Sequence, residues 1–181
     1  MFLGLNKKVK RLLHHNIFFD TDFYKHADDI YTNPKWPEEP CLYVSCTSIT
    51  DTTVAPKGFE NLVILIPVAP GLEDNEEIKE FYLNLAINRI EKITGEQFRE
   101  NIIVKKIFAQ SDFKSLFNAY KGNAYGLSNI LRQTGVLKPK IKNRKLSNFY
   151  YAGQLTVPGP GVPPAILSGK IVANEILRFI R

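Results

Sequence analysis

The chain has 181 residues, of which 44% are hydrophobic, and its 24 Lys and Arg against 18 Asp and Glu give a net charge of +6. This length and composition predict a globular protein of one domain, or of one domain with an appended piece. No apolar run reaches the roughly 18 residues of a membrane span, and we expect no signal peptide because the first basic residues follow the first apolar ones. Cys41 and Cys46 lie in an expected strand and point to opposite faces, so we expect no disulfide and a reducing, cytoplasmic location.

The first part of the chain is predicted to alternate strands and helices. Residues 12–19 fit a strand, residues 22–31 fit a short helix capped by Asp20 or Thr21, and three prolines predict a loop at 33–40. Residues 42–49 alternate apolar and small polar side chains, which is typical of a half-buried strand. The continuous apolar run at 62–68 is typical of a central strand. The turn at 56–58 then makes these two strands antiparallel neighbours.

The strongest helix signal lies at residues 76–94. Leu83, Ile87 and Ile90 recur on one face, acidic residues occupy the first turn, and Gly95 stands at the C-terminal cap. Residues 102–109 predict another strand, Ser111 is suited to cap a helix that runs through Asn118, and residues 127–133 fit a helix ending at Gly135. We therefore predict an α/β fold of the α+β type, with a mixed, largely antiparallel sheet and flanking helices.

The chain ends in a predicted strand, a Gly/Pro loop and a helix. Residues 149–152 are apolar and aromatic, and Gly153 follows them where the backbone must turn or approach another group closely. Helical spacing begins at Pro163. Because a helix start leaves N–H groups free and carries partial positive charge, this corner predicts a site for an anionic or carbonyl-rich ligand.

This corner resembles the C-terminal signature of the phytoene desaturase family of FAD-dependent carotenoid oxidoreductases. In that family G-x-x-T-x-P-G-x-G-[VI]-P leads into a helix that opens with L-S-[AG]-K. Residues 43–67 also resemble the family's strand, D-x-x-x-A-P-x-G turn and second strand, so the resemblance runs from about His14 to the end. Val157, where the family often has His, and Lys138-Pro139, where it often has Arg-Pro, depart from the pattern. The matching positions in the signature are Gly153, Thr156, Pro158, Gly159, Gly161, Val162, Pro163, Leu167, Ser168, Gly169 and Lys170.

The resemblance implies removal of hydride and proton from adjacent carbons of a polyene, with FAD as the acceptor. It implies that Gly153, Gln154 and Leu155 bring backbone N–H groups to the pyrophosphate or ribityl chain. It also implies that Gly161, Val162 and Pro163 place the helix start under the pyrimidine edge of the isoalloxazine. Ser168, about a turn into the helix, is expected to pack only, so that its replacement by Ala has little effect.

Members of that family begin with a strand, a G-x-G-x-x-G turn and a helix that hold the ADP half of FAD. No such motif occurs among the 11 glycines of this chain. We therefore expect the chain to correspond to the last third of such an enzyme, with residues 1–145 as a portion of the substrate domain and residues 146–181 as the C-terminal FAD-binding segment. Alone it is expected to retain no FAD, and its expected partner is an N-terminal FAD-binding half.

Five basic residues fall within eight positions before the last strand. They either form a solvated loop or attract an anionic membrane surface, which would place the protein at the membrane periphery. Nucleic acid is not expected, because no aromatic residues interleave with the cations and no nucleic-acid motif appears. The five residues are Lys138, Lys140, Lys142, Arg144 and Lys145.

The remaining candidates are less specific. His14 and His15 are adjacent in a predicted strand and should point to opposite faces, so no metal site is expected. Tyr120, Tyr125 and the glycines at 122 and 126 could form a pocket for a flat ligand. A set of aromatic residues either lines a tunnel for a long polyene or belongs to the core. This set comprises Phe18, Phe19, Phe23, Tyr24, Tyr31 and Trp36.

Three functions stay open on the sequence. The chain is part of a flavin-dependent carotenoid or isoprenoid oxidoreductase, a non-catalytic carotenoid- or lipid-binding module, or one subunit of a split enzyme.

Overall fold

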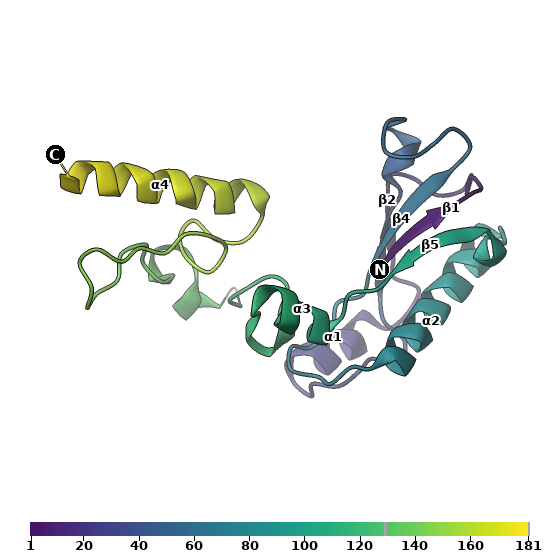
Figure 1. Ribbon diagram of the computed structural model, residues 1–181. Helices are drawn as coiled ribbons and strands as arrows, with labels where there is room; N and C mark the ends of the chain where they lie inside the picture. The colour runs from purple at the N-terminus through teal and green to yellow at the C-terminus, as the bar shows by residue number, and fades with distance from the viewer. Residues whose placement is uncertain (129, 181) are drawn as a thin grey trace. The chain divides into compact units, whose positions relative to one another are not determined.

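The computed structural model describes residues 1–128 and 130–180, and the chain separates into two units, unit 1 (Met1–Gly122) and unit 2 (Asn123–Arg181). Unit 1 is built on a five-stranded antiparallel sheet in the order β2-β3-β4-β1-β5 (Figure 1). The fold is thus mixed α/β, and the largely antiparallel sheet is confirmed. The strands are β1 (Phe2–Leu5), β2 (His15–Phe18), β3 (Leu42–Ser45), β4 (Glu60–Leu65) and β5 (Ile102–Lys106).

Helix α2 (Glu76–Thr94) covers one face of this sheet and has the bounds that its sequence predicts. The Asn75 side chain accepts the N–H of Ile78 at 2.8 Å, and Gly95 adopts the left-handed conformation with φ of 70°. Both ends of the helix are therefore fixed by local signals. Its apolar residues Leu83, Ile87 and Ile90 join the core. Their sheet partners are Leu3, Leu5, Phe18, Leu42, Val44, Leu62 and Ile64.

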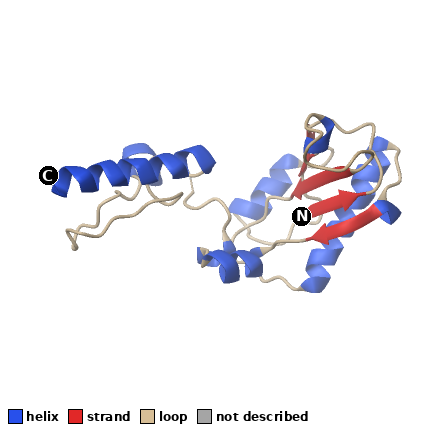
Figure 2. Cartoon of the chain, turned by 45° about the horizontal axis from the view of Figure 1, so that its top comes forward, coloured by secondary structure: helices blue, strands red, loops and turns tan. Residues whose placement is uncertain are grey.

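Strand β1 lies between β4 and β5, as the red arrows in Figure 2 show, and the sequence analysis does not predict it. Phe2 pairs with Val63 of β4, and Gly4 pairs with Val104 of β5. Four residues that include a glycine give too short a pattern to be recognised, and the strand forms because a neighbour on each side satisfies its backbone groups.

Part of the face of the sheet away from α2 is apolar yet accessible. Register places Ile17, Tyr43 and Leu65 in one cross-strand row. Phe2 and Val63 lie side by side in the next row, which continues to polar residues at both ends, Ser45 and His15 on one side and Lys106 on the other. Ile17 and Phe2 are exposed, and Tyr43, Val63 and Leu65 are half-buried. An antiparallel sheet with one solvated face normally carries polar residues there. The exposed apolar side chains of this face therefore favour contact with an apolar partner.

Helix α1 (Phe23–Tyr31) begins one residue later than predicted, and neither predicted cap, Asp20 or Thr21, is used. Asp22 is the N-cap, and its carboxylate accepts the N–H groups of Tyr24 and Lys25. Asp20 instead forms an ion pair with Arg89 of α2, which removes it from the helix start. β3 also ends earlier than predicted, because a 3-10 turn at Thr47–Ile49 takes over.

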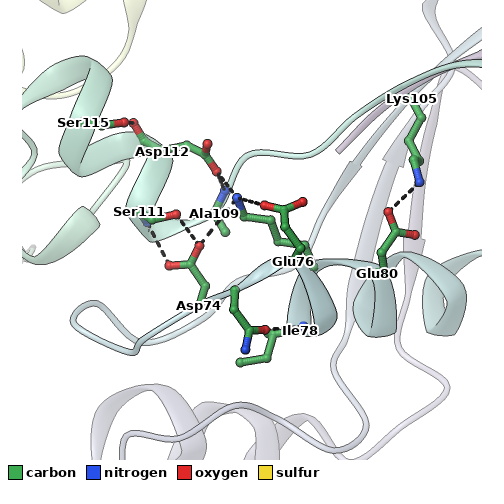
Figure 3. A network of polar contacts seen from close by, with 11 residues as sticks. Asp74, Glu76, Ile78, Glu80, Lys105, Ala109, Ser111, Asp112 and Ser115 are labelled. Carbon is green, nitrogen blue, oxygen red and sulfur yellow. Dashed lines mark hydrogen bonds and ion pairs between the residues drawn. The ribbon is translucent and has the colours of Figure 1, made fainter.

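A network of ion pairs joins the start of α2 to α3 (Gln110–Phe117), as Figure 3 shows. The Lys79 ammonium lies 3.0 Å from Glu76 and 2.9 Å from Asp112, and hydrogen bonding to Asp112 raises the pKa of Lys79. Burial opposes ionisation of Asp112, but the N–H of Ala109 and the Lys79 ammonium outweigh it and lower its pKa. Ser111 donates to Asp74 and does not cap the helix, so the predicted cap at Ser111 is wrong.

The two cysteines are free and buried. The Cys46 thiol donates to the Glu60 carboxylate at 3.0 Å, and the Lys8 ammonium pairs with the same carboxylate at 3.2 Å. Burial and the neighbouring carboxylate raise the pKa of Cys46 to about 12. This thiol therefore stays protonated and is a poor nucleophile.

In unit 2 the described residues form helix α4 (Val162–Ile180) and a long irregular segment. The predicted strand at 149–152 is wrong: the structure has a single bridge there, between Tyr150 and Lys142. A strand needs a neighbour along its length, and the described part of unit 2 offers one residue. The predicted helix at 127–133 includes residue 129, which lies outside the described residues, and Leu131–Gln133 is a 3-10 turn. The functional division at residue 145 stays a prediction.

Candidate functional site

The Gly/Pro loop of unit 2 is held against α4 by Ser168. This serine is fully buried, and its hydroxyl accepts the N–H of Gly153 at 2.7 Å while donating to the Ala165 carbonyl at 2.6 Å. A helical Ser commonly donates to a carbonyl one turn back, which leaves its oxygen free to accept. Ser168 therefore links the entrance of the loop to the first turns of the helix, and the expectation that it only packs is wrong.

Two further contacts fix the middle of the loop. The buried Thr156 hydroxyl donates to the Pro139 carbonyl at 2.7 Å. The Lys138 side chain crosses Gly159, where an added Cβ would lie 3.1 Å from Lys138 Cε. Gly159 also has φ of 137°, which side-chain-bearing residues rarely adopt. The loop is thus anchored to α4 on one side and to the basic segment on the other.

A groove of about 950 Å³ lies beside these anchors within unit 2. Leu155 and Thr156 of the loop contribute to its wall, and so does Lys138. All five residues of the predicted basic run line it, together with apolar side chains and no acidic residue. The lining comprises Leu127, Val136, Leu137, Lys138, Pro139, Lys140, Lys142, Asn143, Arg144, Lys145, Tyr151, Ala152, Leu155 and Thr156.

The six residues expected to contact a cofactor fall into two groups along the loop. Gly153 and Gln154 are half-buried and Leu155 is exposed, whereas Gly161, Val162 and Pro163 are all exposed. The N–H of Gly153 already donates to Ser168, so Gly153 has no free backbone donor for a ligand. What this glycine offers is an open backbone surface. Nothing lies within 4 Å of the position of a Gly153 Cβ, and its φ is 113°. Close approach of a flat group is therefore sterically possible at this glycine.

The start of α4 has one backbone donor to offer. Pro163 and Pro164 carry no N–H, and the Ala165 N–H donates to the Gly161 carbonyl at 3.0 Å. Among the described residues, Val162 therefore holds the N–H of the first turn that is left for another group. The site suits a single hydrogen-bond acceptor placed at the positive end of the helix.

The predicted pocket around Tyr120, Tyr125 and two glycines has a simpler explanation. A Cβ on Gly122 would lie 2.5 Å from Gln110 Cβ, and one on Gly126 would lie 3.0 Å from Leu155 Cδ2. The chain's own side chains thus occupy the space that these glycines leave. Neither glycine needs a ligand to account for it.

His14 and His15 do not point apart as expected. Their ring centroids are 4.2 Å apart, because His14 precedes β2 and escapes the alternation of the strand. The Nδ1 atoms are hydrogen-bonded to the Thr50 and Tyr43 hydroxyls. Within residues 1–128 and 130–180, no group of three or more His, Cys, Asp or Glu is placed to hold a metal ion.

The aromatic set divides between surface and interior. Phe18 is buried, and Trp36 stacks on Tyr82 with its indole N–H on the Glu73 carbonyl. Phe19 and Phe23 lie edge to face at 5.8 Å and are both exposed. Tyr24 and Tyr31 are exposed as well. The exposed members lie on α1 and in the segment that joins it to the edge strand β2.

The sequence from β2 to α4 matches one protein family. Residues 16–177 match the family of flavin containing amine oxidoreductases, so the chain belongs to that family. Among its relatives, the carotenoid 3,4-desaturase of Haloarcula japonica is 39% identical over 180 residues. The 4,4'-diapophytoene desaturase of Staphylococcus haemolyticus is 33% identical over 188 residues, and the lycopene-forming phytoene desaturase of a Paracoccus species is 31% identical over 180.

These alignments cover 98 to 99% of the chain but 36 to 37% of the relatives. The chain therefore spans about a third of the length of the curated relatives that it matches. The resemblance to carotenoid desaturases drawn from the sequence motifs is confirmed. Among the described helices, none has both the length and the apolar run that crossing a bilayer needs.

The residues at the loop and helix start fit one edge of a flavin. Val162 supplies an N–H at a positive helix end, and Gly153 and Gly161 leave backbone open to a planar ring. Unit 2 also keeps the Tyr150 hydroxyl buried without a hydrogen-bond partner among the described residues. Both features suit a surface that another group completes.

Proposed function

We propose that this chain supplies the polyene-facing sheet and the flavin-contacting helix start of a flavin-dependent carotenoid desaturase. The observation that carries the proposal is the corner itself, where Ser168 ties Gly153 to α4 and leaves Gly161, Val162 and Pro163 exposed at the helix start. The family match and the similarity to carotenoid desaturases support it.

The flavin, when bound, accepts the hydride in this family of reactions. The chain's own residues hold and orient it. The Val162 N–H and the α4 dipole favour negative charge at the ring edge, and Gly161 lets the backbone approach the ring plane. Ser168 keeps the loop in this conformation. Gln154 and Leu155 are proposed to contact the ribityl or pyrophosphate part.

The substrate surface is proposed to be the face of the sheet opposite α2. The apolar strip of this face, which suits a long hydrocarbon, comprises Phe2, Ile17, Tyr43, Val63 and Leu65, and Lys106 pairs with Phe2 at its margin. A polyene has no group that needs an ion pair. Phe19 and Phe23, which contact each other and are exposed, are a second apolar surface for such a chain.

The contribution of this chain requires a dinucleotide-binding region, which we propose is supplied by an N-terminal FAD-binding half. The test is to purify the 181-residue chain alone and together with the preceding two thirds of the Haloarcula japonica relative. We expect flavin absorbance and dehydrogenation of a dissolved carotenoid only for the pair. Flavin bound in stoichiometric amount to the chain alone would contradict the proposal that an N-terminal half is needed to hold it.

A second candidate function is a carotenoid-binding module without redox chemistry, favoured by the same open sheet face. The two candidates differ in their need for flavin. Carotenoid binding by the chain alone, measured as a shifted absorbance band, together with no turnover by the pair would favour the binding module.

A further inference from the structure

Strand β5 forms one edge of the sheet in unit 1, because among the described residues it pairs with β1 and with no second strand. Its outer side therefore carries backbone N–H and C=O groups that no strand satisfies. Residues 103–106 are all exposed, and the apolar Ile103 and Val104 are 56% and 59% exposed. Exposed β-branched residues on an open edge favour the addition of another strand.

A groove of about 280 Å³ lies between this edge and α2. The buried Leu83 and Ile87 line it from α2, and Ile102 and Ile103 line it from β5. Two consecutive residues of one strand can line the same groove because the pairing with β1 skips Ile103, which is bulged. The groove can therefore take apolar side chains from an extended segment that lies along the edge.

The cations near this edge limit what the segment can be. Lys105 forms an ion pair with Glu80 at 2.5 Å, as Figure 3 shows. The Lys106 ammonium lies 5.2 Å from the centre of the Phe108 ring, and among the described residues it has no carboxylate within ion-pair distance. Pairing of β5 with β5 of a second copy would bring four lysines together, which is unfavourable. The charges therefore favour a different strand, with an acidic side chain opposite Lys106.

We propose that β5 pairs with an extended strand of the N-terminal FAD-binding half, which lengthens the sheet of unit 1. Alternate side chains of this strand are apolar and enter the groove beside Ile103, and the side chain opposite Lys106 on the other face is acidic. The relatives are long enough to contain such a strand, since the chain covers 36 to 37% of their length. This strand pairing rests on the proposed function, because it needs the N-terminal half.

Hydrogen exchange tests the strand pairing directly. The 181-residue chain is measured by mass spectrometry alone and together with the N-terminal half used in the flavin test. Amide exchange in β5 should slow at least about tenfold in the pair, because the new strand accepts edge N–H groups. Unchanged exchange in β5 of a pair that keeps its flavin would overturn the strand pairing and leave the proposed function standing. Slower exchange in the opposite edge strand β2 alone would also overturn it.

Substitutions test the groove and the charge. Ile103→Lys places an unpaired cation in the apolar groove and should weaken the association of the two halves at least about tenfold. Lys106→Glu should weaken it up to about fivefold, because it sets two acidic side chains opposite each other. Ile93→Lys is the matched control, since Ile93 of α2 is 46% exposed and is not among the residues that line the groove. It should leave the dissociation constant unchanged.

The outcomes separate the possible occupants of this edge. Equal dissociation constants for wild type and Ile103→Lys would overturn the strand pairing, as would an equal loss in Ile93→Lys. A wild-type chain that sediments as a dimer, and as a monomer with Ile103→Lys, would identify a second copy as the occupant and overturn it too. No association of the wild-type halves would contradict both the strand pairing and the proposed function.

Discussion

The two units of the chain are stabilised in different ways. In unit 1, α2 and five strands bury a continuous apolar core. In unit 2, the described residues that are most buried include Lys138, Thr156 and Ser168, which are polar, while Ile166 and Leu177 of α4 are exposed. All apolar side chains in the buried set lie in unit 1. Unit 1 therefore holds itself together by hydrophobic burial, whereas unit 2 relies on hydrogen bonds and presents surfaces for partners to cover.

The largest contrast is expected between two isoleucines. Ile87 of α2 is 1% exposed and Ile166 of α4 is 70% exposed. Ile87→Ala should destabilise unit 1 by about 2 to 5 kcal/mol, because it removes transfer free energy and leaves a cavity. Ile166→Ala should change the stability of the chain by no more than about 0.5 kcal/mol. Urea unfolding followed by circular dichroism measures both, and equal effects would remove the contrast.

Two glycines in unit 1 allow the cost of filling occupied space to be separated from the cost of a positive φ. Gly122 and Gly58 both have positive φ, of 68° and 87°. A Cβ on Gly122 would meet Gln110 at 2.5 Å, whereas nothing lies within 4 Å of one on Gly58. Gly58→Ala should cost about 1 kcal/mol for the left-handed conformation alone, and Gly122→Ala should cost at least about 1 kcal/mol more, because an atom is forced into occupied space. Equal unfolding midpoints for the two variants would show that the space beside Gly122 can yield.

The polar anchoring of unit 2 is tested at Ser168. Ser168→Ala leaves the Gly153 N–H without its acceptor, which should cost about 1 to 3 kcal/mol locally. The Gly153 amide should then exchange with solvent deuterium roughly 5 to 150 times faster, as measured by NMR. Ser147→Ala is the control, since Ser147 is exposed. Unchanged exchange at Gly153 would mean that the hydroxyl does not hold the loop.

The smallest effect is a pH dependence within unit 1. The pKa of Asp112 is lowered below its ordinary 3.8, so its ionised form stabilises the fold above that pH. This contribution is lost as the pH falls from 3.8 through the lower pKa of the folded state. Asp112→Asn should remove that part of the acid sensitivity, seen as a flatter plot of urea midpoint against pH. A plot that keeps its slope would assign the acid sensitivity to other carboxylates.

Helix α2 is predictable because its signals are local in the sequence. Strands are harder to predict because they depend on partners far away along the chain. Asn75 and Gly95 mark both ends of α2 in the sequence itself. β1 depends on pairing with β4 and β5, about 60 and 100 positions away along the chain, which no local pattern of four residues reveals. The strand at 149–152 was predicted from its apolar residues, but a strand also requires a neighbour.

The sequence predicts which residues form the loop of the candidate site, but it does not predict the side chains that hold this loop in place. The glycines and prolines of the loop carry a recognisable motif with fixed spacing. Ser168 looked like an ordinary helical residue, because its partner Gly153 lies 15 positions earlier. The buried state of Lys138 could not be separated from the exposed lysines around it, since both belong to one basic run.

The central claim is that the start of α4 contacts the flavin, and Gly161 tests it most directly. Gly161 is exposed, has φ of 104°, and precedes the free N–H of Val162. In the reconstituted pair of chain and N-terminal FAD-binding half, the ratio of flavin to protein absorbance is measured after gel filtration for wild type, Gly161→Leu and Gly58→Leu. Gly58, in unit 1, controls for the strain of a side chain at positive φ. We predict loss of flavin in Gly161→Leu alone, and a folded Gly161→Leu protein that keeps its flavin would contradict the claim.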